Sequence, residues 1–372
     1  MTEKNRPGKD WPAILLSWFD RNKRDLPWRE DKPRNPYHVW ISEIMLQQTR
    51  TEAVKPYFNS WMERFPTIHD LACADEADVL HQWQGLGYYT RARNIYRAAK
   101  EMEDHYGGKL PKDKEEILSL PGIGGYTAGA ILSMAYGKKE GAIDGNVLRV
   151  YARLYCVEED ILKTGGRKII ESLVKDTLPD RAGDFNEALM DLGAEICIPR
   201  SPRCESCPLL SRCRAFYEGK EKELPKRTPK KPQKEEEAAC AIIVKDGKVL
   251  LHKRPSRGML ASMWEFPMAL SGGAEEAKKK LEAALSGKAG DCLWQYRHVF
   301  THRIWHMKAY RMEDCRVPEG EYGWFAPDEY REIPLAGPHA RLAAFVEQMI
   351  RLQGMVAGHS QHGRRPNSMF SS

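Results

Sequence analysis

The stretch LSLPGIGGYTAGAILSMAY, residues 118–136, places a short glycine-rich turn between two apolar segments with helical spacing. It predicts one helix that ends near Leu120 and a second that begins near Gly125. Such a turn brings backbone N–H groups to the surface at a helix N-terminus, where they can bind a phosphate. Because Gly122 and Gly124 have no Cβ, a nucleic-acid backbone can approach them closely. The stretch therefore predicts a helical hairpin that binds a phosphate backbone; a purely structural corner between two helices is the alternative.

Further helices are predicted on both sides of the hairpin. Apolar residues recur at helical spacing, with Pro or Gly at the joins, over 12–22, 37–65, 75–84, 90–106 and 146–155. The predicted all-α domain spans residues 8–217. It has a six-helix part at about 30–136 and a second part made of 8–29 and 137–217.

The segment 219–234, GKEKELPKRTPKKPQK, carries most of the net charge. Its seven basic and two acidic residues give +5, whereas the whole 372-residue chain has +6. Bulk charge is therefore weak evidence for nucleic-acid binding. The segment has three prolines and almost no apolar residue, so residues 218–236 are predicted to be an extended, solvated linker. Phosphate contact by this linker is the alternative.

Residues 237–352 show a different pattern. Two β-rich runs flank Asp246-Gly247, a hairpin signal, and 293–312 contains two further aromatic-rich strands. An amphipathic helix follows, and 353–372 reads as a frayed tail. The fold class is thus multidomain, an all-α domain followed by an α+β domain. No apolar run approaches the ~20 residues of a membrane span, and the start MTEKNRPGKDW predicts no secretory signal. A cytoplasmic protein with no membrane partner is expected, in which cysteines are thiols or metal ligands.

Four of the nine cysteines follow the spacing C-x6-C-x2-C-x5-C: Cys197, Cys204, Cys207 and Cys213. Four thiolates from one short segment can enclose a 4Fe-4S cluster. Zinc is the alternative, although structural zinc sites more often use two C-x2–4-C pairs with a longer spacer. This spacing resembles that of the endonuclease III superfamily of DNA glycosylases. Four interleaved arginines suggest a phosphate-facing loop, with solvated side chains as the alternative: Arg200, Arg203, Arg212 and Arg214.

Asp144 and Glu43 are the two candidate catalytic carboxylates. Asp144 precedes a predicted helix, where an N-cap role is the simplest interpretation. Glu43 lies among apolar residues in a predicted helix, and a helical glutamate ordinarily points to water. If Glu43 faces a dry pocket instead, desolvation raises its pKa and makes it a competent acid near pH 7. Two carboxyl groups whose pKa values are pushed apart would suit the cleavage of a glycosidic bond.

The stretch from 26 to 213 closely resembles the MutY family of adenine DNA glycosylases in the helix-hairpin-helix superfamily. The match is carried by LPWR (26–29), EIMLQQT (43–49), GLGYY (85–89), LPGIGGYTA (120–128), IDGNV (143–147) and FNEAL (185–189). The resemblance implies a monofunctional hydrolase of base excision repair that flips and excises adenine opposite 8-oxoguanine or guanine. It also implies a 4Fe-4S cluster on the four cysteines and a monomer bound to double-stranded DNA.

The resemblance also assigns roles to residues. Glu43 would be the general acid and Asp144 the carboxylate that stabilises the cationic sugar, with Tyr126 and Asn146 in support. The adenine pocket would comprise Leu26, Trp28, Arg29 and Glu187. Contacts that wedge or fill the duplex would come from Gln48, Thr49, Leu86 and Tyr88, and the hairpin glycines Gly122 and Gly124 would meet the DNA backbone.

Residues 237–352 resemble the Nudix-related domain of the same family, which recognises 8-oxoguanine. WEFPM (264–268) supports the resemblance, whereas GGAEEAKKKLEAALSG (272–287) lacks the clustered glutamates that bind magnesium in a pyrophosphohydrolase. A recognition domain without hydrolase activity is therefore expected. Phe300, Thr301 and His302 resemble the lesion-reading loop, with threonine where the family has serine.

Three alternatives remain beside the adenine glycosylase. An endonuclease III-like glycosylase–lyase would need a lysine where this chain has Tyr126, because that lysine forms a Schiff base with the sugar. A non-catalytic Fe–S DNA-binding protein would not need Glu43 and Asp144. A nucleotide-pool hydrolase would need the missing magnesium carboxylates.

Overall fold

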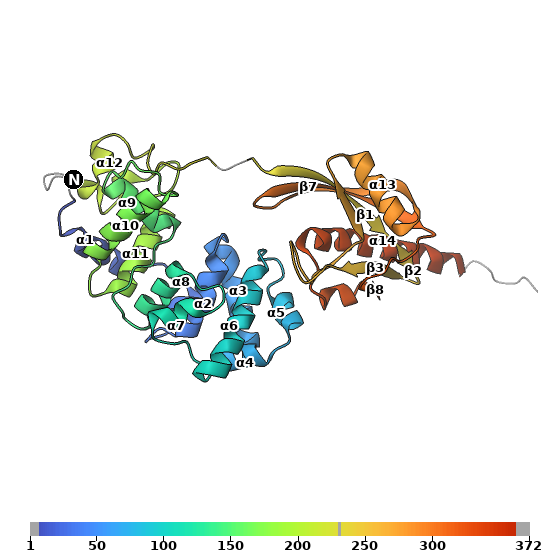
Figure 1. Cartoon of the computed structure of the whole chain (residues 1–372), viewed down its shortest axis with the longest axis horizontal. Helices are drawn as coiled ribbons and strands as arrows, with labels where there is room; N and C mark the ends of the chain where they lie inside the picture. The colour runs from blue at the N-terminus through green and yellow to red at the C-terminus, as the bar shows by residue number, and fades with distance from the viewer. Residues whose placement is uncertain (1–6, 230–231, 362–372) are drawn as a thin grey trace, which may run out of the picture. The chain divides into compact units, whose positions relative to one another are not determined.

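The structure is a computed structural model that describes residues 7–229 and 232–361, and it divides into two compact units with the main break at residue 230 (Figure 1). The first unit is helical and the second combines two sheets with two α-helices, which confirms the predicted fold class. Among the described helices, none is both long and apolar enough to cross a membrane.

The helices of the first unit follow one another with short connections. Their bounds are α1 Trp11–Asn22, α2 Pro36–Leu46, α3 Thr51–Arg64, α4 Ile68–Cys73, α5 Glu76–Gln82, α6 Thr90–Tyr106, α7 Lys114–Ser119, α8 Gly125–Ala130, α9 Gly145–Leu154, α10 Thr164–Thr177, α11 Ala182–Glu195 and α12 Arg214–Tyr217. Shorter 3-10 turns are η2 Pro27–Arg29, η4 Cys204–Ser206 and η5 Leu210–Arg212, and η3 Ile131–Ala135 is a π-helical segment that continues α8.

One hydrophobic core joins α1 to α9, α10 and α11, so that chain segments from both sides of α2–α8 pack together. Trp11, Leu15 and Phe19 of α1 are buried against Tyr151 of α9 and Phe185 of α11. The Trp11 indole also donates a hydrogen bond to the hydroxyl of Tyr155 over 3.1 Å. This packing brings the N-terminal end of α9 and one face of α11 toward the α2–α8 part of the unit.

The predicted helix over 37–65 is wrong in one respect, because it is broken into α2 and α3 at residues 47–50. Gln48 adopts a left-handed backbone with φ 59°, which a continuous helix cannot contain. The break creates a surface loop directly after Glu43 and its apolar neighbours.

The predicted linker 218–236 needs a second correction. Thr228 donates its backbone N–H to Asp160 over 2.7 Å, Lys220 and Lys226 both pair with Glu158, and Leu224 is buried. Residues 218–228 therefore form a strap that packs on the loop after α9, and the first strand of the second unit already begins at 234. Apolar burial of Leu224 and local ion pairs outweigh the extended tendency of a proline-rich, charged segment.

The second unit contains two four-stranded sheets. Its elements are β1 Lys234–Ile242, β2 Val244–Lys245, β3 Lys248–Lys253, β4 Trp264–Glu265, β5 Met268–Ser271, α13 Ala274–Leu285, β6 Lys288–Val299, β7 Arg303–Glu313, β8 Tyr322–Phe325, η6 Glu329–Arg331 and α14 Gly337–Gln361. One sheet has the order β5-β1-β7-β6, with β1 and β7 parallel and the other pairs antiparallel. In the other sheet β3 pairs with β2, β4 and β8.

The predicted turns and strands of this unit are confirmed. Asp246 and Gly247 both have positive φ, 51° and 74°, and join β2 to β3. The strands predicted within 293–312 are β6 and β7. The final helix continues to Gln361, past the predicted boundary at 352, and the remainder of the predicted tail lies outside the described residues.

Candidate active site

A cavity of about 580 Å³ in the helical unit brings together most of the residues selected from the sequence. All the predicted catalytic and base-pocket residues line it, with two of the predicted duplex contacts: Leu26, Trp28, Arg29, Glu43, Gln48, Thr49, Tyr126, Asp144, Asn146 and Glu187. They come from η2 and the residue before it, α2, the loop between α2 and α3, α8, the start of α9 and α11. Leu86, Tyr88, Gly122 and Gly124 are described too but are outside this lining.

Glu43 is a buried carboxyl group, with 5% of the residue exposed. It lies on α2 beside α8, and the Tyr126 hydroxyl donates a hydrogen bond to its Oε2. The pKa of Glu43 is raised to about 7, mainly by burial. The hydrogen bond from Tyr126 opposes the shift, and the nearby carboxyls of Asp144 and Glu187 add to it. The ordinary expectation of a solvated helical glutamate is therefore wrong here.

Asp144 combines the N-cap role with a place in the cavity wall. Its Oδ1 accepts the backbone N–H of Val147 over 2.7 Å, which caps α9. Its Oδ2 accepts a hydrogen bond from Nδ2 of Asn146, also over 2.7 Å. Burial raises the pKa of Asp144, whereas both hydrogen bonds lower it by favouring the ionised form. The two carboxyl groups thus have different support: Asp144 receives hydrogen bonds suited to an anion, and Glu43 is largely desolvated.

Arg24, Arg29 and Glu187 of the cavity lining belong to a network of ion pairs. Of this network, the sequence predicted only Arg29 and Glu187 as site residues. Arg29 donates to Glu187 over 3.1 Å and to Asp191 over 2.8 Å. Arg34 also binds Glu187, over 3.0 Å, and Arg24 binds Asp191 over 2.6 Å. The side chains of Glu187 and Asp191 are almost fully buried. This network fixes the orientation of Arg29 and Glu187 in the cavity wall.

Sequence reasoning missed Arg24, Arg34 and Asp191. Glu187 and Asp191 are four residues apart on α11 and therefore share a helix face. The matching arginines are spaced over residues 24–34. Two carboxylates on one face of an apolar helix were thus an available signal that buried charges would need partners.

The hairpin between α7 and α8 has the predicted form. Gly122 has φ +77°, and a Cβ there would lie 2.6 Å from the Cβ of Asn94, so the fold itself requires this glycine. Gly124 and Gly125 are exposed, and a Cβ at either would meet nothing within 4 Å. Backbone N–H groups at the start of α8 are therefore accessible to a large partner.

Two further predicted contacts lie in strained loops. Gln48, between α2 and α3, has φ 59°, and Tyr88, two residues before α6, has φ 50°. Tyr88 is 45% exposed. Leu86 lies between Gly85 and Gly87, both of which have positive φ. Left-handed backbone at non-glycine positions is uncommon and concentrates at functional sites.

Cys197 lies just after α11, and the other three spaced cysteines lie in or beside η4, η5 and the start of α12. All four are half-buried free thiols. Each of the other three thiols contributes to the raised pKa of Cys207, after burial as the larger cause, so the group is spatially close. A tetrahedral zinc site with sulfur at about 2.3 Å would bring the sulfurs within about 4 Å of one another. No three of these thiols, all of which the structure describes, lie within 4.8 Å. The donor set fits a larger sulfur-bridged iron cluster better than zinc.

Two buried arginines of α9 hold the cysteine loop. Arg153 donates to the Sγ of Cys197 over 3.3 Å and to the carbonyls of Ile198 and Pro199. Arg149 donates to the Cys197 carbonyl over 2.7 Å and to Oδ1 of Asn146 over 2.8 Å. Of the four interleaved arginines, Arg212 pairs with Asp10 and Arg214 with Glu218. The phosphate-facing interpretation therefore loses these two and retains the exposed Arg200 and Arg203.

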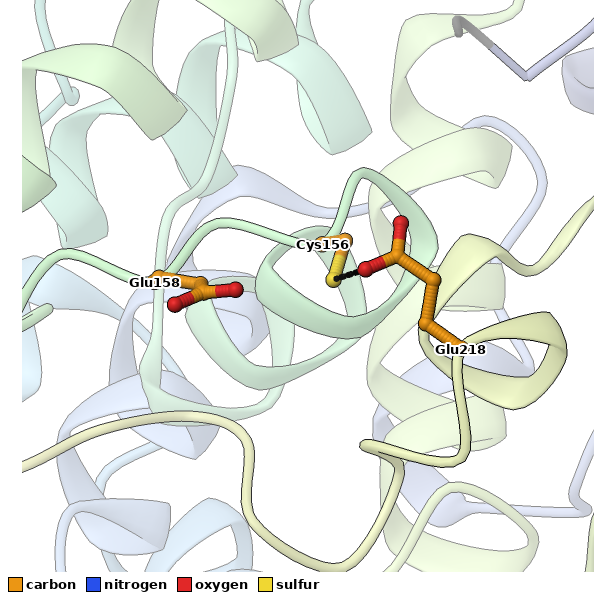
Figure 2. A group of neighbouring side chains, drawn as sticks. All are labelled: Cys156, Glu158 and Glu218. Atoms are coloured by element: carbon orange, nitrogen blue, oxygen red, sulfur yellow. Dashed lines mark hydrogen bonds between the residues drawn. The ribbon is translucent and has the colours of Figure 1, made fainter.

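A second group of ligand-type atoms, drawn in Figure 2, includes Cys156, which packs in one hydrophobic cluster with Cys213. Cys156, Glu158 and Glu218 place one ligand atom each within 4.8 Å, and Cys156 donates to Glu218 over 3.3 Å. Lys220 donates to both glutamates, over 2.5 and 3.0 Å. The lysine already compensates their charge, so this group belongs to the strap described above.

The predicted lesion-reading loop joins β6 to β7 in the second unit. The Phe300 ring packs against His298 and Trp305, with centroids 4.3 and 4.8 Å apart. Thr301 is half-buried and His302 is exposed. The loop thus has one anchoring aromatic residue, Phe300, beside a half-buried Thr301 and an exposed His302.

Comparison with known proteins defines the class first. Residues 41–176 match the family described as HhH-GPD superfamily base excision DNA repair protein, and residues 238–344 match the NUDIX domain. The helical unit is also similar to the solved structure of a thermostable thymine-DNA glycosylase, with 30% identity and a TM-score of 0.51, over 56% of this chain and 96% of that one.

Curated relatives then specify the family. The chain is 36% identical over 319 residues to the adenine DNA glycosylase of Homo sapiens, covering 72% of this chain and 58% of that protein. It is 34% identical over 347 residues to that of Mus musculus, covering 77% and 67%. The Buchnera aphidicola (Acyrthosiphon pisum) protein is 35% identical over 297 residues, covering 79% and 84%. The chain belongs to the adenine DNA glycosylase family, and it spans little more than half the length of the human relative.

Proposed function

We propose that this chain is a monofunctional adenine DNA glycosylase that flips adenine out of duplex DNA and hydrolyses its N-glycosidic bond. The observation that carries the proposal is the buried Glu43, which shares one cavity with Asp144 and with the Arg29–Glu187 pair. The substrate proposed is adenine opposite 8-oxoguanine or guanine. The proposed enzyme acts as a monomer in the cytoplasm.

Proton donation by Glu43 is the first step of the proposed reaction. Adenine is a poor leaving group unless a ring nitrogen is protonated. With a pKa of about 7, roughly half of Glu43 is protonated at neutral pH, whereas about 0.2% of an ordinary glutamate would be. The Tyr126 hydroxyl binds Oε2, which leaves Oε1 to donate toward the base. Arg29 and Glu187, fixed by their ion pairs, would orient the adenine edge.

Asp144 stabilises the sugar that is left as adenine departs. As adenine leaves, the sugar approaches an oxocarbenium ion, which a nearby carboxylate stabilises. The hydrogen bonds from Val147 and Asn146 favour the ionised form of Asp144 and hold it in place. Water then adds to the sugar, so the bond broken is C–N and the bond formed is C–O. Because Tyr126 replaces the Schiff-base lysine of a lyase, we expect no covalent amine adduct.

The four cysteines would hold a 4Fe-4S cluster, whose role is to fix the loop 197–213 against α9. Iron and sulfide analysis is expected to give about four of each per chain. Stoichiometric zinc would contradict this proposal.

DNA contact is proposed for the hairpin and for the two strained loops. Backbone N–H groups at Gly124 and Gly125 would bind a phosphate, and Gln48, Thr49, Leu86 and Tyr88 would fill the duplex where adenine leaves. The second unit would recognise 8-oxoguanine through Thr301 and His302. Its α13 carries AEEAKKKLEAAL, which is rich in lysine and lacks the REUxEE core whose glutamates bind magnesium in a hydrolase.

Strand scission by hot alkali after incubation with defined duplexes tests the function. Scission at adenine opposite 8-oxoguanine, with none at thymine:adenine pairs or thymine glycol, is expected. Scission at thymine glycol, or a borohydride-trapped adduct, would favour the glycosylase–lyase alternative.

Glu43→Gln is expected to retain duplex binding and lose adenine release. Excision by this variant at the parent rate would contradict the role of Glu43.

A further inference from the structure

Arg91, in the first turn of α6, inserts its guanidinium into the end of α2. Its Nη1 donates to three main-chain carbonyls: those of Ile44 over 2.8 Å, Met45 over 2.9 Å and Gln47 over 2.6 Å. The last carbonyls of a helix have no partner within the helix, and a cation is favourable at this end. Arg91 therefore stabilises the point at which the predicted continuous helix breaks into α2 and α3.

The same guanidinium contacts both strained loops. Its Nη2 lies 3.4 Å from Oγ1 of Thr49, in the loop that contains the left-handed Gln48. It also lies 5.5 Å from the ring centroid of Tyr88, at a distance typical of a cation–π contact. Burial lowers the pKa of Arg91 to about 10, so the side chain stays charged at neutral pH. One buried cation thus links residues 47–49 to Tyr88.

We infer that Arg91 is a positioning residue that holds the 47–49 loop and Tyr88 in one arrangement before DNA binds, so that both enter the duplex together as adenine is extruded. This inference rests on the proposed function. Preorganisation removes the ordering cost that two independent loops would add when they insert. Arg91 acts through these loops, and it does not touch the base.

The test compares Arg91→Met with Arg97→Met, a matched change at an exposed arginine of the same helix. Adenine release is measured under single-turnover conditions from two duplexes, with adenine opposite 8-oxoguanine or opposite an abasic analogue. An unpaired adenine is easier to extrude. We expect Arg91→Met to lower the rate on the paired duplex at least about tenfold, the effect of losing hydrogen bonds from a charged donor. The loss on the unpaired duplex should be much smaller, and Arg97→Met should match the parent on both.

Equal losses on both duplexes would overturn the inference, since they would indicate a general effect on the fold or on Glu43. Fluorescence of 2-aminopurine in place of the target adenine, measured with the Glu43→Gln chain, reports extrusion without chemistry. Arg91→Met in that background should reduce the fluorescence rise, and an unchanged rise would also overturn the inference. Should Arg91→Met fail to fold, Arg91→Lys keeps the charge but not the fork of donors, and the same duplex difference is expected. A parent chain that excises adenine from neither duplex would contradict the proposed function instead.

Discussion

Glu43 and Asp144 line the same cavity but differ in their hydrogen bonds and in the charges around them. Both are desolvated, and burial raises both pKa values. Asp144 also accepts hydrogen bonds from a helix N-terminus and from Asn146, which favour its anion. Glu43 accepts a bond from Tyr126 but faces two other carboxyls. A protonated acid and an ionised carboxylate can therefore coexist near neutral pH, as cleavage of a glycosidic bond requires.

The rate of adenine release should follow the protonation of Glu43. With a pKa of about 7, the single-turnover rate is expected to level off below pH 6 and to fall about tenfold per unit above pH 8. At more acidic pH the rate should fall again as Asp144 becomes protonated. A pH series under single-turnover conditions measures both limbs. A rate that stays constant between pH 6 and 9 would be incompatible with Glu43 as the acid.

Burial of Glu43 should also be visible in stability, independent of catalysis. A carboxyl whose pKa is raised in the folded state loses stability as pH rises from its unfolded value, 4.5, through its folded value of about 7. The difference corresponds to roughly 3 kcal/mol. Glu43→Gln has no such titration, so its stability relative to the parent should increase between pH 4.5 and 7.5, as measured by urea unfolding of the helical unit. Glu63→Gln, at an exposed position of α3, should show no such trend.

Gly122 and Gly124 of the hairpin are glycines for different reasons. The backbone conformation and the packing require Gly122, whereas we propose that Gly124 leaves room for a DNA phosphate. Gly122→Ala should destabilise the chain by more than ~1 kcal/mol, because φ is +77° and the new Cβ would meet Asn94. Gly124→Ala has ordinary φ of −99° and open space, so melting temperature should be unchanged or slightly higher. Its duplex affinity should nevertheless fall, because the Cβ would hold a phosphate away. If Gly124→Ala binds duplex DNA like the parent, the hairpin does not approach the DNA backbone closely.

Secondary structure was predictable where the local signal and the packing agree. The hairpin and the Asp246-Gly247 turn each depend on local chemistry, and both appear as expected. The break between α2 and α3 was not predictable, because it depends on Arg91, which is more than forty residues away along the chain. The roles of Arg24 and Arg34 were not predictable for the same reason, because their partners Asp191 and Glu187 lie on α11, far along the chain.

The strap 218–228 shows how far composition can mislead about a linker. Its amides are hydrogen-bonded: Lys220 to the carbonyl of Ala215 over 2.7 Å and Leu224 to that of Lys220 over 3.0 Å. Hydrogen–deuterium exchange should therefore be slow at residues 220, 224 and 228, whereas a solvated tether would exchange within seconds. Leu224→Ser should abolish this protection by removing the buried side chain. Fast exchange of these amides in the parent would restore the tether interpretation.

The division of the chain into two units follows from the change of pattern near residue 230. The charge distribution agrees with the expectation that bulk charge is weak evidence for nucleic-acid binding. Lys220 and Lys226 of the basic segment are paired with Glu158, and Arg212 and Arg214 with Asp10 and Glu218. The charge of these four side chains is thus compensated within the unit. Affinity for DNA would then depend on oriented backbone groups and inserted side chains more than on a basic surface.

The second unit should determine which base opposite adenine is preferred, through two polar residues on one loop. Thr301→Ala and His302→Ala should leave the rate on guanine:adenine duplexes unchanged and lower the preference for 8-oxoguanine:adenine, because we propose that these side chains read the lesion while Phe300 packs on Trp305. Phe300→Ala should instead destabilise the unit by roughly 1–3 kcal/mol, since it removes a partly buried ring. The measurement is the ratio of single-turnover rates on the two duplexes, with the melting temperature of each variant as control. A ratio that is unchanged in both Thr301→Ala and His302→Ala would place lesion recognition elsewhere in the chain.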